Sequence, residues 1–177
     1  GFNLPDFRAT ERSFQLITQM SGRAGRHIKA GETPGQVYVQ TLNPDHPSLT
    51  FAKDGLYEAF AEYELESRKP LFYPPFGRLA SFRIQGQHLD RVQNASEKLA
   101  QRAQHLKMKN SSFAEIEVLG PAEAPMAKLR GQFRYHLLLK SPTGKGLTSF
   151  CYQIMGQEEW LPPGVRLSVD VDPLHLL

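Results

Sequence analysis

The chain has 177 residues, enough for one domain or two small ones. Its 40% hydrophobic and 22% charged residues are typical of a soluble globular protein, and no apolar run approaches the roughly 20 residues that a membrane helix needs. With one cysteine, Cys151, and six scattered histidines, the sequence offers no internal disulfide and no metal-ligand spacing. These features predict a cytoplasmic protein without membrane contact and without a metal site in this chain.

Positive charge is concentrated in the second part of the chain. The formal net charge is +3, but residues 70–177 carry 13 basic and 9 acidic side chains, whereas residues 1–69 carry 8 and 9. An excess of cations on one part favours a nucleic-acid surface there. A solvated basic face without a ligand is the alternative.

The first 69 residues predict helices around one short strand. A helix is expected over 6–21, because its apolar residues recur at helical spacing and suit a core face: Phe14, Leu16, Ile17 and Met20. Residues 36–41 alternate like a strand, and helices near 46–53 and 55–69 follow. In the last helix, Glu62, Glu64 and Glu66 are interpreted as a solvated face.

A proline-rich stretch divides the chain. Pro70 and the run Tyr73-Pro74-Pro75-Phe76-Gly77 break the helical pattern, which predicts domains at 1–69 and 79–177 with a linker at 70–78. The second domain shows the order β-α-β-β-α-β, with strands at 79–85, 115–119, 132–140 and 165–171 and helices at 89–107 and 145–155. The predicted class is therefore α+β, with a ferredoxin-like second domain whose two helices cover one sheet face.

The strongest candidate site is the run Gln19-Met20-Ser21-Gly22-Arg23-Ala24-Gly25-Arg26, at the end of the first predicted helix. Glycines at 22 and 25 allow the backbone to turn out of the helix. Two arginines three residues apart are suited to phosphate binding, because a guanidinium is always charged and can donate two hydrogen bonds to phosphate oxygens. Arg23 and Arg26 are thus candidates for contacting a nucleotide phosphate. A basic cap on an ordinary helix is the alternative.

The chain alone is not expected to hydrolyse ATP. A phosphate loop needs G-x-x-x-x-G-K-[ST], so that backbone amides and a lysine surround the phosphates. The run Pro142-Thr143-Gly144-Lys145-Gly146 fails this pattern, because glycine stands at the hydroxyl position. An acidic box after a strand is also missing from the sequence.

A second candidate site lies between residues 128 and 145, where no acid interrupts five cations: Lys128, Arg130, Arg134, Lys140 and Lys145. Phosphate attraction with aromatic stacking is typical of single-strand binding, and Phe133 and Tyr135 supply aromatic rings. Strand alternation gives these rings an alternative place in the core. Lys128 and Arg130 are predicted on a loop after Pro125 and are the better contact candidates.

Taken in order, several segments resemble one known family. The run 19–26 resembles the sixth motif of superfamily-two helicases, which reaches ATP from the second motor lobe. This resemblance implies that Gln19, Gly22, Arg23 and Arg26 contact ATP and that Arg23 and Arg26 are catalytic. The segments that follow resemble the C-terminal part of the primosomal protein N′ (PriA) family of replication-restart helicases, over essentially the whole chain: Asp6–Arg12, Pro34–Val37, Asn43–Pro47, Tyr73–Arg78, Leu119–Ala122 and Asp170–Pro173.

The resemblance implies a fragment of an ATP-dependent 3′→5′ DNA helicase that recognises stalled or branched forks and restarts replication by primosome assembly. Residues 1–69 would end its second motor lobe and supply an arginine finger. ATP with Mg and the family's zinc would bind outside this chain. The implied partners are branched or single-stranded DNA, the tail of the single-stranded-DNA-binding protein and other primosome proteins, in a bacterial, nucleoid-associated setting. The alternative is a stand-alone, non-catalytic nucleic-acid-binding or adaptor module.

Overall fold

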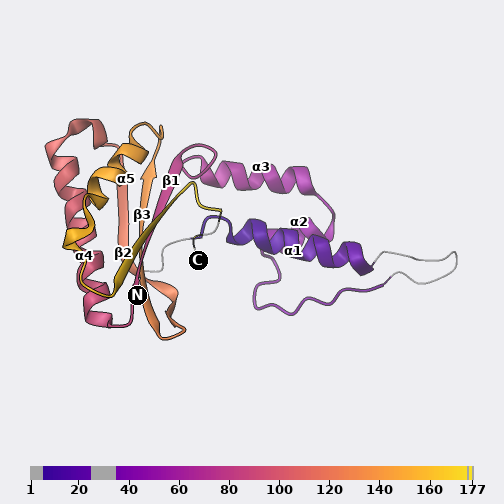
Figure 1. Cartoon of the computed structure of the whole chain (residues 1–177). Helices are drawn as coiled ribbons and strands as arrows, with labels where there is room; N and C mark the ends of the chain where they lie inside the picture. The colour runs from indigo at the N-terminus through magenta and orange to yellow at the C-terminus, as the bar shows by residue number, and fades with distance from the viewer. Residues whose placement is uncertain (1–5, 25–34, 175, 177) are drawn as a thin grey trace. The chain divides into compact units, whose positions relative to one another are not determined.

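The computed structural model of the chain describes residues 6–24, 35–174 and 176, and its fold is α+β. The chain divides into two compact units (Figure 1). One spans Phe7–Pro70 and is helical, and we call it the helical unit. The other begins at Leu71 and contains a four-stranded sheet, and we call it the sheet unit.

The helical unit contains α1 (Ala9–Ala24), α2 (Pro47–Lys53) and α3 (Tyr57–Arg68), close to the three predicted helices. Its small core is aromatic: the rings of Phe14 and Phe60 stack with centroids 4.1 Å apart, and both side chains are buried. The predicted apolar stripe on α1 is wrong in part, because Leu16 and Met20 are 57% and 45% exposed. Helices α2 and α3 are too short to cover a whole face of α1.

The strand predicted at 36–41 is wrong, because this segment has no regular structure. It runs beside α1 and α2 and lines an open groove of about 490 Å³ with Val37, Val39 and Thr41. A strand needs a neighbour for its backbone hydrogen bonds. None of the described residues of the helical unit forms a strand that could provide one.

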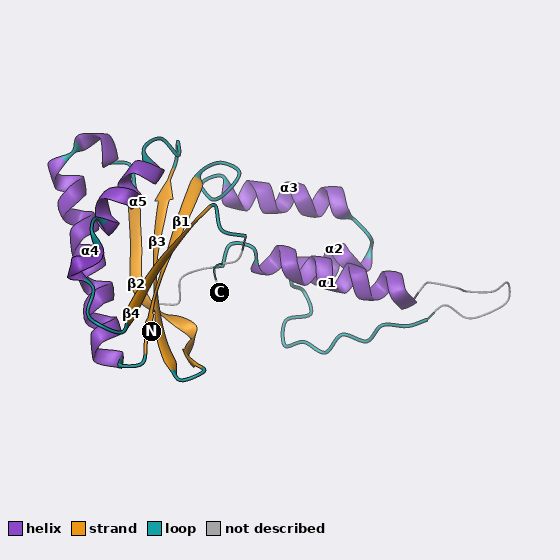
Figure 2. Cartoon of the chain, viewed as in Figure 1, coloured by secondary structure: helices purple, strands orange, loops and turns teal. Residues whose placement is uncertain are grey.

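The sheet unit follows the predicted order of elements: β1 (Arg78–Gly86), α4 (Leu89–Lys109), β2 (Glu117–Leu129), β3 (Gln132–Ser141), α5 (Leu147–Met155) and β4 (Val165–Val171). Short 3₁₀ turns at Ser111–Phe113 and Glu158–Trp160 add to the connections. The strand order is β2-β3-β1-β4, and each neighbouring pair is antiparallel (Figure 2).

The core of the sheet unit lies between the sheet and helices α4 and α5. Alternate residues of each central strand point into it, among them Phe82, Ile84, Leu137 and Leu139, all fully buried. Tyr135 belongs to this core and Phe133 packs against its edge, so the core interpretation of these two aromatic rings is correct. The same alternation places the neighbouring side chains on the opposite, helix-free face of the sheet.

Strand β2 is longer than predicted and turns directly into β3. It continues to Leu129, with shifts of register after Leu119 and after Glu123. Prolines within this stretch suggested a loop, but β2 is an edge strand, where proline is tolerated. The turn to β3 is Arg130-Gly131, both with positive φ (50° and 78°), as a tight hairpin turn requires. Lys128 therefore lies on a strand and not on the predicted loop, whereas Arg130 lies in the turn.

Candidate functional site

Three of the predicted nucleotide-binding residues lie on the last two turns of α1. Gln19, Gly22 and Arg23 are all exposed. Gln19 and Arg23 are four residues apart, so they share one face of the helix. The turn predicted at Gly22 is wrong, because α1 continues to Ala24, and a side chain at Gly22 would meet nothing within 4 Å. Gly25 and Arg26 lie outside the described residues.

Arg23 has no ion-pair partner among residues 6–24 and 35–174. An exposed guanidinium at the end of a helix can reach an anion brought by another part of a protein. Within the described part of the helical unit, no glycine-rich loop or acidic pair accompanies it. Arg23 is therefore open to contact by an anion from outside this unit.

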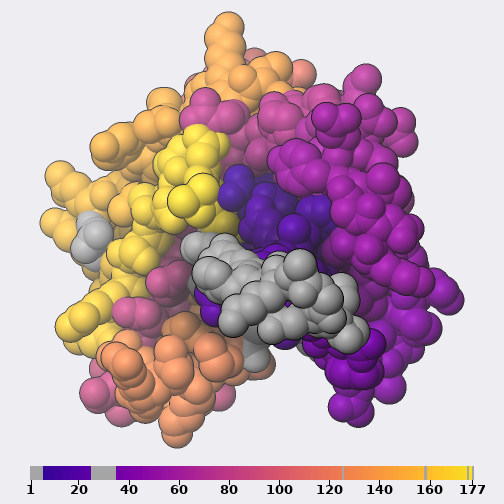
Figure 3. All heavy atoms as spheres, turned by 90° about the vertical axis from the view of Figure 1, so that its right-hand side faces the viewer, coloured from indigo at the N-terminus to yellow at the C-terminus, as the bar shows by residue number. Residues whose placement is uncertain are grey.

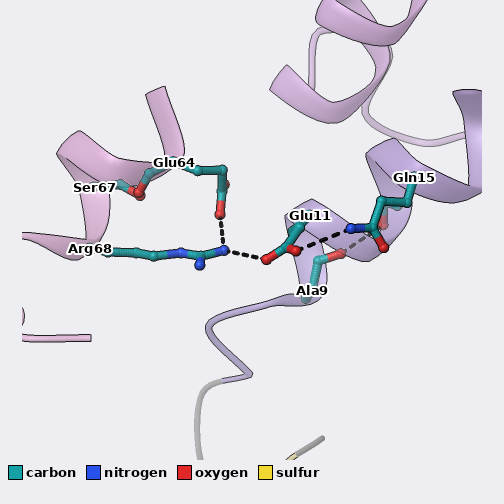
Figure 4. A network of polar contacts seen from close by, with 7 residues as sticks. Ala9, Glu11, Gln15, Glu64, Ser67 and Arg68 are labelled. Atoms are coloured by element: carbon teal, nitrogen blue, oxygen red, sulfur yellow. Dashed lines mark hydrogen bonds and ion pairs between the residues drawn. The ribbon is translucent and has the colours of Figure 1, made fainter. Parts of the chain in front are cut away.

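Arg68 joins α1 to α3 inside the helical unit (Figure 4). One nitrogen, Nη2, donates to Glu64 Oε2 at 2.8 Å and to Glu11 Oε2 at 2.9 Å. Gln15 in turn donates to the other oxygen of Glu11 at 3.1 Å. Glu64 is buried, so its prediction as a solvated residue is wrong, while Glu62 and Glu66 are exposed as predicted. The network fixes α3 on the helix that carries Arg23.

Replacement of Arg68 by methionine is expected to destabilise the helical unit by roughly 3 kcal/mol, because it leaves the buried Glu64 carboxylate without its cation. The measurement is urea unfolding followed by circular dichroism at 222 nm. The matched control is the double variant Arg68→Met/Glu64→Leu, which removes both charges and should regain most of the loss. Equal stability of the single and double variants would contradict this assignment.

The basic residues predicted for DNA or partner binding fall into separate groups. Lys128 and Arg130 are exposed at the β2–β3 hairpin, and Lys128 Nζ lies 5.0 Å from the centroid of the Phe133 ring. Arg134 supports the hairpin, since its Nε and Nη2 donate to the Met126 carbonyl at 3.1 and 2.7 Å. Atoms of this part of the chain (salmon to orange) lie at the lower left in Figure 3.

Lys140 is not available to an outside ligand. It is 9% exposed, its Nζ pairs with Glu117 Oε2 at 2.7 Å, and the ammonium lies 5.1 Å from the Tyr73 ring centroid. Burial, together with the charge of Glu117, raises the pKa of Tyr73. Lys140 is thus a buried cation held by the half-exposed Glu117, which leaves its ammonium unavailable for the predicted contact role.

Lys145 is exposed but lies beyond the other end of β3, in the turn that leads to α5. A ten-residue strand separates this turn from the hairpin, a distance of about 30 Å. The structure therefore does not bring Lys145 together with Lys128 and Arg130.

Two further cations, Arg83 and Arg166, lie on the helix-free face of the sheet together with the predicted contact residue Arg134. Arg83 on β1 is opposite His136 on β3, while Arg134 and Arg166 are opposite Gln85 on either side. His136 is 3% exposed, and burial together with the charges of Arg83 and Arg134 lowers its pKa to about 4. The register of the strands shows that these side chains are neighbours.

Buried neutral His136 should make the stability of the sheet unit depend on pH. An unfolded histidine has a pKa near 6.5, so between pH 6.5 and 4 the unfolded chain binds a proton that the folded chain does not. The free energy of unfolding should fall by about 3 kcal/mol as the pH decreases across this window.

Fluorescence of Trp160, whose indole N–H donates to the Met155 carbonyl at 2.7 Å, reports unfolding of this unit. His136→Gln should flatten the pH profile between 4 and 6.5, whereas His105→Gln, at an exposed position on α4, should leave it unchanged. An unaltered profile in the His136 variant would contradict the assignment.

Other site classes find no support in the described part of the chain. Residues 6–24 and 35–174 contain no group of histidine, cysteine and carboxylate side chains that could hold a metal ion. Cys151 is buried, which raises its pKa to about 12 and leaves its thiol unreactive. None of the helices in the described ranges has the length and apolar character required to cross a bilayer.

These features define a class: an α+β sheet domain with a basic hairpin, preceded by a helical unit with an exposed arginine at a helix end. The family model described as "Primosomal protein N C-terminal domain" matches residues 69–174. This match covers more than half of the chain, so the chain belongs to the primosomal protein N C-terminal domain family.

Curated relatives extend the similarity to the helical unit. The chain is 38% identical over 177 residues to the replication restart protein PriA of Synechocystis, covering 98% of this chain and 20% of that protein. It is 33% identical over 177 residues to PriA of Bacillus subtilis, covering 99% and 21%, and 38% identical over 171 residues to PriA of Haemophilus influenzae, covering 97% and 22%. The chain thus spans about a fifth of the length of the curated relatives that it matches.

Proposed function

We propose that the chain is the C-terminal part of an ATP-dependent DNA helicase that restarts replication at stalled or branched forks. The observation that carries the proposal is similarity along nearly the whole chain, including the run at 19–26, to proteins named replication restart protein PriA. The helicase would act in the bacterial cytoplasm, at the nucleoid, with 3′→5′ polarity and primosome assembly as its outcome.

In this proposal the helical unit is the end of the second motor lobe. Arg23 and Arg26 stabilise the charge of the phosphoryl group in transfer, and Gln19 and Gly22 belong to the same nucleotide contact. Exposure of Gln19 and Arg23 on one face of α1 supports this role. ATP, Mg and the zinc of the family would be bound by parts of the protein other than this chain, which would be inactive alone.

The sheet unit is proposed to be a ferredoxin-like domain that binds branched or single-stranded DNA. Its order of elements and its strand order β2-β3-β1-β4 support this fold. Lys128 and Arg130 at the hairpin are the proposed DNA contacts, with Arg134 positioning the hairpin. Lys145, near α5, is proposed for protein partners: the tail of the single-stranded-DNA-binding protein or another primosome protein.

The hairpin contact is tested by removing two charges without changing the turn. The variant is Lys128→Gln/Arg130→Asn. Residues 130 and 131 both have positive φ, which asparagine followed by glycine readily adopts, so the hairpin should be retained. If both residues contact phosphates, the slope of log affinity for forked DNA against log salt should become shallower by about 2.

The control variant Lys98→Gln/Lys109→Gln removes two exposed charges from α4 and should keep the original slope. Identical slopes for the hairpin variant and the control would exclude the hairpin as the DNA contact.

A further inference from the structure

The connection between α3 and β1 forms a compact loop (Figure 1), and from Leu71 onward it belongs to the sheet unit. Helix α3 ends at Arg68, the division between the two units falls after Pro70, and β1 begins at Arg78. Tyr73 is 7% exposed, whereas Leu71 is 53% exposed. The burial of the chain therefore changes sharply just after the division.

Tyr73 packs over an ion pair of the sheet. Lys140 on β3 lies opposite Glu117 on β2, and its Nζ is 2.7 Å from Glu117 Oε2. The same ammonium lies 5.1 Å from the centroid of the Tyr73 ring, within the range of a cation–π contact. Lysine is rarely buried unless its charge is paired, and Lys140 is 9% exposed. The ring and the carboxylate together therefore account for a buried cation, and the cation holds the ring in return.

The residues after Tyr73 close a turn that lies against the end of β3. The Phe76 N–H donates to the Tyr73 carbonyl at 2.9 Å. Gly77 is buried, and a Cβ at this position would collide with the Phe72 carbonyl oxygen and lie 3.0 Å from the Ser141 carbonyl oxygen. Glycine is required here because backbone approaches backbone on two sides.

Phe72 has a backbone conformation that its own side chain does not explain. Its φ is 51°, in the left-handed region that bulky residues rarely adopt. The residue is 46% exposed, so burial of its ring does not hold this conformation. The conformation is held instead by the packing of Gly77 against the Phe72 carbonyl and by the burial of Tyr73, the next residue. Phe72 thus lies at the boundary between the packed residues and the exposed ones before them.

We propose that residues 73–77 form a strap fixed to the sheet unit, and that the contact of Tyr73 with Lys140 confines the pivot between the two units to residues 70–72. A free tether of three residues spans at most about 10 Å. With the strap released, the tether would include residues 70–77 and span roughly 27 Å. The contact is thus a conformational device that sets how far, and about which residues, the two units can move. It involves no nucleic acid and no nucleotide, so its test is separate from that of the proposed function.

Limited digestion of the whole chain with chymotrypsin tests the pivot, because this protease cuts after large apolar residues that become accessible. Leu71 and Phe72 report on the pivot, and Phe76 reports on the strap. The bond after Tyr73 is not cut, because proline follows it. In the unchanged chain, fragment masses should show the cut after Phe76 at least about tenfold slower than those after Leu71 and Phe72. Equal rates would overturn the proposal.

Substitutions at Tyr73 should release the strap alone. Tyr73→Ala should speed the cut after Phe76 at least about tenfold, because cleavage follows the population of the open strap. Tyr73→Phe keeps the ring over the ammonium and should stay within about twofold of the unchanged chain. The control Tyr152→Ala removes an exposed tyrosine from α5 and should also leave this rate unchanged. A Tyr73→Ala rate equal to that of the control would refute the anchoring contact.

A double variant shows whether Lys140 acts through Tyr73. Lys140→Ala should also speed the cut after Phe76, and Tyr73→Ala/Lys140→Ala should be no more than about threefold faster than Tyr73→Ala, since both remove one contact. Rates that multiply would contradict the proposal. Trp160 fluorescence should stay native in every variant, since the release is local. Its loss in Tyr73→Ala would show that the strap belongs to the cooperative core, and this result too would overturn the device.

Discussion

Alanine in place of Arg26, in a full-length protein of the family that carries this chain, is expected to lower ATP turnover by about 10³-fold or more. Arg23→Ala should act in the same direction. A guanidinium that contacts the phosphoryl group only as charge develops there lowers the barrier without strengthening substrate binding, so turnover should fall more than the affinity for ATP. The measurement is steady-state ATP hydrolysis stimulated by forked DNA.

Two comparisons make this result specific to the proposed finger. Lys69→Ala removes an exposed charge at the end of α3 and should leave turnover unchanged. Affinity for forked DNA should stay within about twofold in the Arg26 variant, because the proposed DNA contacts lie in the sheet unit. Wild-type turnover in the Arg26 and Arg23 variants would refute the nucleotide contact.

Phe82→Ala is expected to destabilise the sheet unit by roughly 3–5 kcal/mol, the largest stability effect in the described part of the chain. Phe82 lies at the centre of β1, is fully buried, and packs between the sheet and its two helices. For a unit of this size the loss corresponds to a fall in melting temperature of roughly 15–30 °C. Thermal unfolding followed by Trp160 fluorescence measures it.

A conservative variant shows whether the loss of stability comes from a cavity or from any substitution at this position. Phe82→Leu keeps an apolar side chain of similar volume and should cost less than about 1.5 kcal/mol. A loss below 1 kcal/mol for Phe82→Ala would show that this position is not in the core. In that case the assignment of the two sheet faces would be wrong.

Hydrophobic periodicity predicted the sheet unit well because each strand has one face in the core. Strand β4 has the predicted bounds, 165–171, and β1 alternates between buried and partly exposed residues. Strand propensity was less informative for β2. Its prolines suggested that the strand ends early, but an edge strand tolerates proline. The segment 36–41 shows the opposite error: its alternation is typical of a strand, but pairing needs a neighbour that a local pattern cannot supply.

Ion pairs and strand register account for the site residues that sequence reasoning placed incorrectly. Glu64 and Lys140 look solvated by residue type, yet Arg68 and Glu117 allow them to be buried. That Arg83, Arg134 and Arg166 are neighbours depends on the register of β1 with β3 and β4, which no spacing along the chain reveals. By contrast, helical spacing alone is enough to place Gln19 and Arg23 on one face of α1.

The central claim is that this chain carries a nucleic-acid surface of its own, and fork binding in a salt series tests it most directly. The chain should bind forked DNA at low salt, more tightly than blunt duplex of equal length. Because phosphate contacts release counterions, the affinity should fall at least tenfold between 50 and about 200 mM salt. No binding at low salt, or an affinity that does not change with salt, would contradict the account.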